Sequence, residues 1–357
     1  MKIGIDLRFL QEEDLYSLFV FSIVQELIKN TKHEFIIYSD TGFEDDLGMA
    51  KTEIVEEKIG SIGENFSLIK KIKKQNFDLM IFFNEYKPLS YTDDYVLVIP
   101  SLQRLFFGPF KNSLAKHYYL KLLSSNINHA KKIICLDKKT KSDLNERFNI
   151  EEDKIEIIKG FFPIREAILI EDNDLNIKNK HALTGDYILY DSEESSIKNL
   201  DKVLNSIKKL KEENQILNLI ILGEDAGKNL EFRKMVVDYG INDLVFFVGE
   251  VDNAQRQNYY RQSVGLVYPN IYETFPFELN NALIYGTPMI VSDLEVIKEA
   301  TLGELEYFNA LSNMDTLEAL KTFLKKKKNP NYKKILDYNT PLKYSNEMLD
   351  IIDNKLD

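Results

Sequence analysis

The 357-residue chain has no tryptophan, a single cysteine and no excess of basic residues. Because one cysteine has no partner in the chain, an intramolecular disulfide is excluded, and a structural metal site is not indicated. Cys135 lies in the apolar segment 132–136, where we expect it to pack in a buried strand. The net charge of −11 argues against a general nucleic-acid-binding protein or a protein of acidic membranes, since both need a basic surface.

A long apolar run and a secretory leader are also missing. No stretch approaches the roughly 20 uninterrupted apolar residues that a membrane-spanning helix needs. The N-terminus starts with a strand pattern at residues 2–7, not with a charged segment followed by an apolar one. These features predict a cytoplasmic protein.

What is present is an ordinary globular composition, with 44% hydrophobic and 29% charged residues. A chain of this length exceeds the size at which one hydrophobic core stops growing, which favours two domains. Short apolar strands alternate with amphipathic helices from residue 3 to residue 158, and the alternation restarts at residue 187. This pattern is typical of parallel sheets built from βαβ units.

The polar stretch between the two series indicates a linker, and we place the domain boundary near residue 165. We predict an α/β protein with two Rossmann-like, doubly wound parallel-sheet domains. The predicted parts are residues 1–165, residues 166–340 and a C-terminal helix at 341–357 that packs back on the first domain. In that helix Leu349, Ile352 and Leu356 share one face.

Two loops of the second domain are candidate ligand sites, because ligands of doubly wound sheets bind at the carboxyl ends of strands. The first loop follows the strand at 187–190 and ends at Lys198. This lysine could neutralise a diphosphate. An exposed lysine in the first turn of a helix explains the same pattern, so both interpretations stay open.

The second loop follows a strand that ends at Pro269 and precedes a helix that starts near residue 277 and stops at Gly286. Glu273 lies in this loop and is a candidate ligand-contacting residue. Segment 3–8 has one glycine only, so the glycine-rich turn of dinucleotide-dependent oxidoreductases is absent, which counts against a dehydrogenase. The backbone N–H groups that would suit an anion belong to Thr274, Phe275 and Phe277.

The segment 268–288 resembles the donor-site motif of the family 4 retaining glycosyltransferases, which have the GT-B fold. Segments 198–200, 220–223 and 245–249 resemble further motifs of that family, and the resemblance covers nearly the whole chain. It implies a GT-B-like architecture, in which the two Rossmann-like domains face a cleft. The positions that match the main motif are Pro269, Glu273, Phe275, Ala282, Gly286 and Pro288.

The resemblance implies a hexosyltransferase that moves a sugar from a nucleoside diphosphate sugar to a glycan, lipid-linked or protein acceptor. It also implies retention of the anomeric configuration and no metal or other cofactor. Lys198 and Glu273 would be the catalytic residues, with Lys198 on the diphosphate and Glu273 on the hydroxyls of the donor sugar. The donor site would be completed by Thr274, Phe275, Phe277, Asn281 at the ribose, and Gly249.

Several positions depart from the family pattern. Asn281 replaces the second acid of the motif, Glu193 replaces an arginine of the phosphate loop, and Pro100 takes the place of a histidine. Glu278 stands where many members have proline. These changes favour an alternative in which the chain is catalytically degenerate and acts as a non-catalytic partner, a regulator or a glycan-binding module.

The expected partners are a nucleotide sugar and an acceptor, and no nucleic acid. A peripheral membrane contact and a homodimer or heterodimer with a related transferase stay open. The aromatic segment 106–110 is either an acceptor or lipid-side surface or a hydrophobic cover of the core. Glu85 and Arg104 are the candidates for a catalytic group of the first domain.

Overall fold

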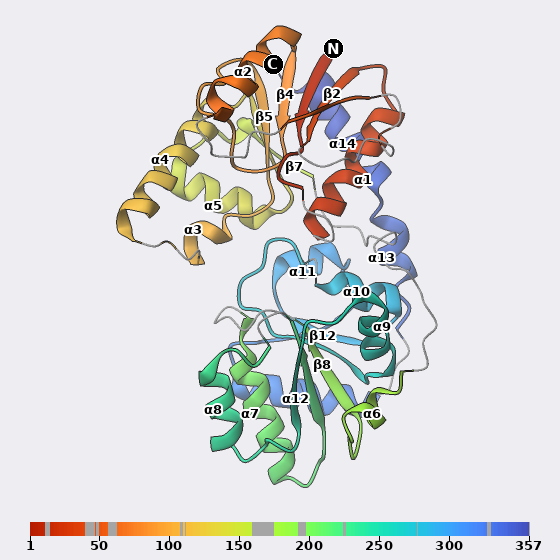
Figure 1. Ribbon diagram of the computed structural model, residues 1–357. Helices are drawn as coiled ribbons and strands as arrows, with labels where there is room; N and C mark the ends of the chain where they lie inside the picture. Colours follow the sequence, from red (N-terminus) through yellow and green to blue (C-terminus); the bar gives the residue numbers. More distant parts are fainter. Residues whose placement is uncertain are drawn as a thin grey trace. The chain divides into compact units, whose positions relative to one another are not determined.

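The computed structural model describes residues 1–10, 15–39, 47, 50–55, 63–107, 110, 112–158, 175–191, 198–223, 226–276, 278–326 and 330–356. The chain divides into two compact units (Figure 1). The first unit comprises Met1–Phe162 and Asn339–Asp357, and the second comprises Pro163–Tyr338. The predicted boundary at residue 165 lies outside the described residues.

The first unit is built on a seven-stranded parallel sheet with the order β3-β2-β1-β4-β5-β6-β7. Its inner strands are apolar and buried on both faces, as expected when helices cover both sides of a parallel sheet. Cys135 lies buried in this sheet, which confirms its predicted place. The strands are β1 (Lys2–Asp6), β2 (Glu34–Ser39), β3 (Lys51–Ile54), β4 (Leu79–Phe82), β5 (Tyr95–Ile99), β6 (Lys132–Cys135) and β7 (Ile155–Ile157).

Helices of the first unit pack on this sheet, and the C-terminal helix α14 returns to pack on α1. The rings of Phe19 and Tyr344 meet edge to face at 5.4 Å across this contact. The Thr340 side chain caps α14 and proline follows at its first position, which suits a helix start. The helices are α1 (Leu15–Lys29), α2 (Ser67–Gln75), α3 (Gln103–Phe107), α4 (Ser113–His129), α5 (Lys138–Phe148), α14 (Pro341–Asn354) and the 3-10 helices η2 (Gly63–Asn65) and η3 (Glu152–Lys154).

The second unit is built on a six-stranded parallel sheet with the order β10-β9-β8-β11-β12-β13. A side chain at Gly265, the first residue of β11, would collide with Phe323, since its Cβ would lie 2.3 Å from that ring. Glycine therefore lets α12 approach the sheet closely. The strands are β8 (Tyr187–Asp191), β9 (Asn218–Leu222), β10 (Val245–Gly249), β11 (Gly265–Tyr268), β12 (Met289–Ser292) and β13 (Glu306–Phe308).

Apolar side chains of α7, α8 and α12 form one core with the second sheet, and α9 packs against α6 and α10 (Figure 1). Gly286 ends α10 with a φ of 70°, a left-handed conformation that glycine adopts readily, as the sequence predicted. The helices are α6 (Ile177–Lys180), α7 (Leu200–Glu212), α8 (Leu230–Asp238), α9 (Asn253–Gln262), α10 (Leu279–Tyr285), α11 (Glu295–Ala300), α12 (Asn313–Lys326) and α13 (Lys333–Tyr338).

Both sheets are doubly wound, which confirms the predicted α/β class with two Rossmann-like parallel sheets. In each sheet the winding reverses at the first strand, between β1 and β4 in the first unit and between β8 and β11 in the second. A crevice forms at such a switch point, outside the carboxyl ends of the strands, and ligands bind there.

Candidate functional site

The candidate site of the second unit lies at the carboxyl ends of β8 and β11, at the switch point. Tyr268 is the last residue of β11, and Lys198 lies two residues before α7, the helix that follows β8. The connection from β11 to α10 adds Asn270, Glu273 and Glu278. We call these five residues the Lys198 cluster.

Lys198 is the centre of this cluster, and its side chain is only 7% exposed. Its ammonium nitrogen lies 2.6 Å from Glu278 Oε1 and 3.8 Å from Glu273 Oε2. The same nitrogen lies 5.8 Å from the centre of the Tyr268 ring. The interpretation of Lys198 as an exposed lysine is therefore wrong, because its charge is buried beside two carboxylates.

The Tyr268 hydroxyl joins these two carboxylates. It hydrogen-bonds Glu273 Oε2 and lies 3.0 Å from Glu278 Oε2. A hydroxyl has one proton to donate, so both contacts are satisfied together only when one carboxyl group also carries a proton. Burial, and then the charge of Glu278, raise the pKa of Glu273 above its usual value, so Glu273 is the group that takes this proton more readily.

Glu278 differs from Glu273 in both charge and exposure. Burial alone would raise the pKa of Glu278, but the charge and hydrogen bond of Lys198 outweigh it and hold that pKa below its usual value. The Glu278 side chain is 31% exposed, whereas that of Glu273 is 6% exposed. The cluster therefore combines one buried carboxyl group with one ionised and more accessible carboxylate.

Glu273 is anchored by its own loop. Its Oε1 accepts hydrogen bonds from the backbone N–H groups of Thr274 at 3.0 Å and Phe275 at 3.2 Å. Asn270 Nδ2 donates to Oε2 at 2.9 Å. We expected these two N–H groups to serve an anion, but in the structure they bind the Glu273 carboxylate, which folds back on them. Phe277, the third expected donor, lies outside the described residues.

A second group of side chains, the Asp191 cluster, lies at the end of β8, at the same edge of the sheet. Asp191 Oδ2 accepts hydrogen bonds from Arg256 Nη1 at 2.5 Å and from the Tyr260 hydroxyl at 2.7 Å. Asn281 of α10 hydrogen-bonds the same tyrosine. Burial alone would lower the pKa of the Arg256 guanidinium. The charge and hydrogen bond of Asp191 outweigh burial and raise that pKa above its usual value. Asn281, the expected ribose residue, therefore lies in a cluster that contains a cation.

The remaining predicted positions of the second unit lie apart from these clusters or outside the described residues. Gly249 ends β10, the outer strand, and its carbonyl accepts a hydrogen bond from the Gly223 N–H at 3.2 Å. Two strands therefore separate it from β11. Glu193 and the other residues from 192 to 197 in the predicted phosphate loop lie outside the described residues.

The switch point of the first unit holds a buried ion network that the sequence did not indicate. Arg8 follows β1 and binds Asp6 Oδ2 at 2.6 Å and Glu64 Oε1 at 2.7 Å. The Tyr86 hydroxyl donates to Glu64 Oε2 at 2.9 Å. Burial alone would lower the pKa of the Arg8 guanidinium. The hydrogen bonds and charges of Asp6, and then of Glu64, outweigh burial and raise that pKa above its usual value.

The candidates named for the first unit meet at one tyrosine. The Tyr119 hydroxyl donates to Glu85 Oε1 at 3.3 Å, and the Arg104 guanidinium lies 5.1 Å from the centre of the Tyr119 ring. Pro100 follows β5, and its carbonyl accepts a 3.5 Å hydrogen bond from the Thr140 hydroxyl. Glu85 and Arg104 thus lie together at the carboxyl edge of the first sheet.

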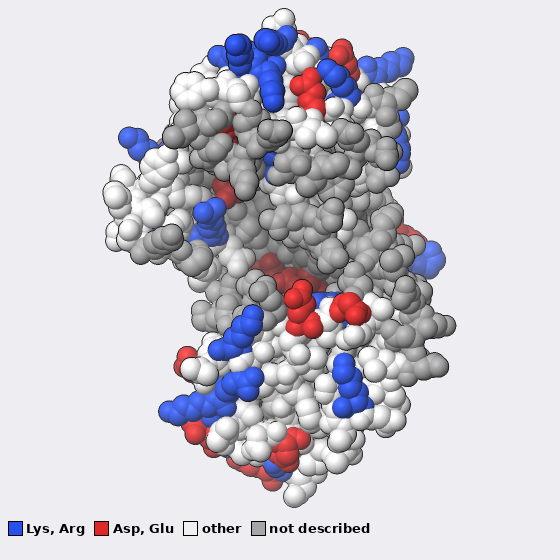
Figure 2. Space-filling view, viewed as in Figure 1, with Lys and Arg blue, Asp and Glu red and all other residues white. Residues whose placement is uncertain are grey.

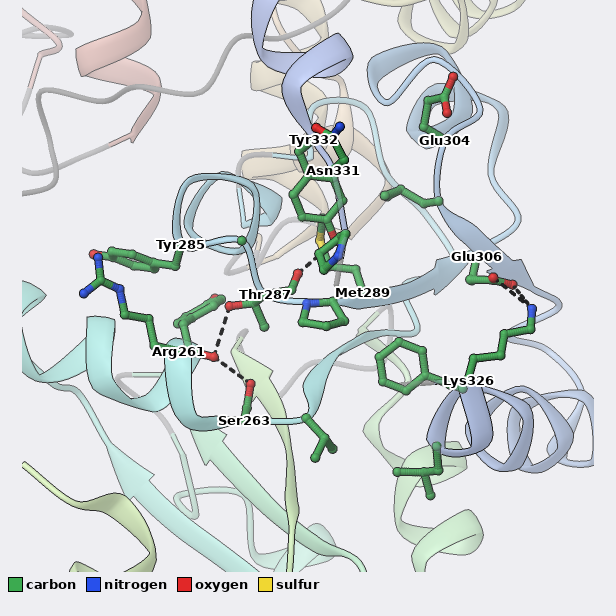
Figure 3. A pocket seen from close by; sticks show the side chains of 18 of the residues that line it. Arg261, Ser263, Tyr285, Thr287, Met289, Glu304, Glu306, Lys326, Asn331 and Tyr332 are labelled. Atoms are coloured by element: carbon green, nitrogen blue, oxygen red, sulfur yellow. Dashed lines mark hydrogen bonds and ion pairs between the residues drawn. The ribbon is translucent and has the colours of Figure 1, made fainter. Parts of the chain in front are cut away.

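A cavity of about 600 Å³ lies at the opposite edge of the second sheet (Figure 3). Val264, Pro288 and Glu306 line it, and they lie at the amino ends of β11, β12 and β13. It shares Tyr260 with the Asp191 cluster and no residue with the Lys198 cluster. Since the ligands of doubly wound sheets bind at the carboxyl ends of the strands, this cavity is not part of the candidate site.

Comparison with known proteins gives a family match within the second unit. Residues 173–335 match the family model described as glycosyl transferases group 1. This segment contains both the Lys198 cluster and the Asp191 cluster. The match therefore covers the whole candidate site of the second unit.

Relatives point to the same class. The O-antigen chain mannosyltransferase RfbU of Salmonella typhimurium is 26% identical over 206 residues, which are 58% of this chain and 54% of that protein. The chain spans about half the length of the curated relatives it matches. The family match and this relative support a transferase of the glycosyltransferase class.

Solved structures show the fold over the full chain. A glycosyltransferase from Rickettsia africae has a TM-score of 0.67 at 16% identity, over 99% of both chains. Anabaena Alr3699/HepE, solved in complex with UDP and glucose, has a TM-score of 0.68 at 11% identity, also over 99% of both chains. At these identities the likeness shows the fold, which is the two-unit α/β fold of GT-B glycosyltransferases. Across the described ranges, no helix has both the length and the apolar character to cross a bilayer.

Proposed function

We propose that the chain is a metal-independent, retaining glycosyltransferase that moves a hexose from a nucleoside diphosphate sugar to a lipid-linked acceptor. One observation carries the proposal: a buried lysine lies beside Glu273 at the switch point of the unit that matches group 1 glycosyltransferases. A buried cation at this place suits the negative charge that develops on a departing diphosphate. The UDP and glucose bound to the Anabaena neighbour support a nucleotide sugar as the donor class.

In this proposal the residues of the second unit bind and orient the donor. Lys198 stabilises the diphosphate, Glu273 accepts hydrogen bonds from hydroxyls of the donor sugar, and Asn281 binds the ribose. Thr274 and Phe275 act through Glu273, because their N–H groups hold its carboxylate in place. They are therefore positioning residues of the donor site.

The reaction transfers one glycosyl group. The bond between the anomeric carbon and the diphosphate oxygen breaks, and its electron pair leaves with the diphosphate. The acceptor hydroxyl oxygen bonds the anomeric carbon on the face that the diphosphate left, and its proton passes to the departing oxygen. Lys198 supplies the positive charge that lowers the cost of this departure.

The acceptor class is proposed from the surface of α3 and α4. Apolar side chains stand exposed there: Phe106 is 44% and Phe107 48% exposed, and Tyr118 is 57% exposed. Residues 95–136 contain six Lys and Arg and no Asp or Glu, although the whole chain has a net charge of −11. Figure 2 shows largely uncharged surface over α4 with basic atoms beside it. Exposed aromatics next to basic groups suit the interface of an anionic bilayer.

We expect the chain to bind vesicles that contain an anionic phospholipid, and the double variant Phe106→Ser, Phe107→Ser to bind them about tenfold more weakly or worse, because two apolar anchors are lost. Vesicle co-sedimentation at low and high salt measures this. The matched control is Leu230→Ser, which removes an exposed apolar side chain of α8 in the other unit and leaves binding unchanged. Equal binding by all three proteins would contradict a lipid-side role of α3 and α4.

The donor site is tested by a thermal-shift screen with UDP, GDP, ADP, TDP and CDP and their sugar conjugates, in buffer with EDTA. A ligand present at 100 times its Kd stabilises the fold by about 2.7 kcal/mol, so even weak donors register at high concentration. We expect a clear shift with one base, and none with that base in the Lys198→Ala variant. A well-folded protein that shifts with none of them would instead support the non-catalytic partner.

A further inference from the structure

The Lys198 ammonium is already held by a carboxylate of its own chain. We propose that Glu278 is an internal counterion that an incoming nucleoside diphosphate must displace from Lys198, so that this side chain sets the affinity for the donor. The inference rests on the proposed function, in which Lys198 binds the donor diphosphate. In this inference Glu278 opposes donor binding, whereas Lys198 and the other residues of the donor site promote it.

The geometry assigns the two carboxylates different tasks. Glu273 is fixed by three donors of its own loop, the Asn270 amide and the backbone N–H groups of Thr274 and Phe275. Glu278 is held through its side chain by Lys198 at 2.6 Å and by the Tyr268 hydroxyl at 3.0 Å. The contact of Glu278 with Lys198 is therefore the closer of the two ion pairs, 2.6 Å against 3.8 Å.

Exposure decides which carboxylate can leave. The Glu278 side chain is 31% exposed, so rotation about its side-chain bonds moves the carboxylate into water, where its charge is well solvated. Glu273 is 6% exposed and would have to break four hydrogen bonds, three from its own loop and one from the Tyr268 hydroxyl. An anion that competes for Lys198 consequently displaces Glu278 and leaves Glu273 in place.

The charge count gives the reason for the displacement. With the proton on Glu273, the Glu278 carboxylate balances the Lys198 charge, so the cluster offers a diphosphate no net positive charge. Once Glu278 turns to water, the Lys198 charge is no longer balanced, and the ammonium protons that Glu278 occupied can bind phosphate oxygens. Glu278 therefore acts as an anion that holds the place of the diphosphate when no donor is bound.

The test compares Glu278→Gln with the wild-type chain by calorimetric titration of the nucleoside diphosphate that gives the largest thermal shift. Glutamine keeps the shape of glutamate and removes its charge, so we expect the Kd to fall about tenfold or more, the range of a charge-assisted hydrogen bond. Inorganic pyrophosphate should gain in the same way, and the parent nucleoside should not. The control is Glu295→Gln, which removes one exposed acid of α11 in the same unit and should leave the Kd unchanged.

Melting without nucleotide separates this role from a purely structural one. Glu278→Gln should melt below the wild type, because Lys198 loses its closest counterion, and yet bind the diphosphate more tightly. A structural role predicts lower melting with an unchanged or weaker affinity, and that result would overturn the inference. If wild type binds, Lys198→Ala does not, and Glu278→Gln gains nothing, the proposed donor site stands and the counterion role fails. If neither wild type nor Glu278→Gln binds a nucleoside diphosphate or pyrophosphate, both proposals fail.

Discussion

Replacing Lys198 with alanine is expected to lower kcat/KM for sugar transfer by about 100-fold or more, the loss seen when one preorganised electrostatic donor is removed from an active site. The Lys198 ammonium is buried and held by Glu273 and Glu278. In the alanine variant a water molecule at this place would be neutral and could not replace the positive charge. The loss should appear in donor binding, because Lys198 holds the diphosphate of the bound donor, and also in kcat, because the negative charge on the leaving diphosphate grows in the transition state. Initial rates with the donor identified by thermal shift measure it.

The same substitution should also lower the melting temperature, which the sequence alone did not suggest. Alanine leaves the carboxylates of Glu273 and Glu278 without their buried cation, and removal of one partner of a buried pair is costly. The double variant Lys198→Met, Glu278→Gln removes both partners and should recover part of the melting temperature without recovering turnover. Turnover close to that of wild type in either variant would show that Lys198 has no role in the chemistry.

Replacing Arg8 with alanine is expected to destabilise the first unit by about 3–5 kcal/mol, the cost of leaving buried charges without their partner. Asp6 and Glu64 would keep their carboxylates in a site where the Arg8 side chain is 1% exposed and that of Glu64 is fully buried. Hydrogen–deuterium exchange at increasing denaturant concentration measures the stability of each unit separately. Strands β1 and β4 should lose protection, while β8 and β11 keep theirs.

A surface pair of the same unit provides the control. Lys29 is 62% exposed and lies 3.2 Å from Glu26, so Lys29→Ala should change stability by no more than about 0.5 kcal/mol. The double variant Arg8→Met, Glu64→Gln should be less destabilised than Arg8→Ala, because it leaves fewer buried charges unpaired. If Arg8→Ala costs no more than Lys29→Ala, the buried network contributes no net stability.

Much of the fold could be predicted because its signals are local. The apolar runs of β4, β5 and β8 and the stop at Gly286 are read from a few neighbouring residues. The two strands that were missed, β3 and β13, lie at sheet edges. Strand β3 reads Lys-Thr-Glu-Ile, and none of its residues is buried. Its pairing with β2 depends on the sheet, because such a segment has no apolar pattern of its own.

For the candidate site, too, some residues could be predicted from the sequence and others could not. The segment around Glu273 could be found from its resemblance to a donor-site motif, and Asp191 could have been found as the acid that ends an apolar strand. Arg256 carries no such signal, because it lies on a polar helix and meets Asp191 only across the unit, 65 residues away in the chain. The pairing of Lys198 with Glu278, 80 residues apart, was likewise not predictable.

The sequence by itself therefore determined the α/β class, the two parallel sheets and the loops at which ligands are expected, since these follow from periodicity and short-range turns. Only the tertiary structure decided the chemical state of those loops. It buried Lys198, closed the Glu273 carboxylate on its own backbone and set Glu278 against the lysine. The reason is physical: burial, charge pairing and the competition between hydrogen-bond partners depend on distances between residues that are far apart in the chain.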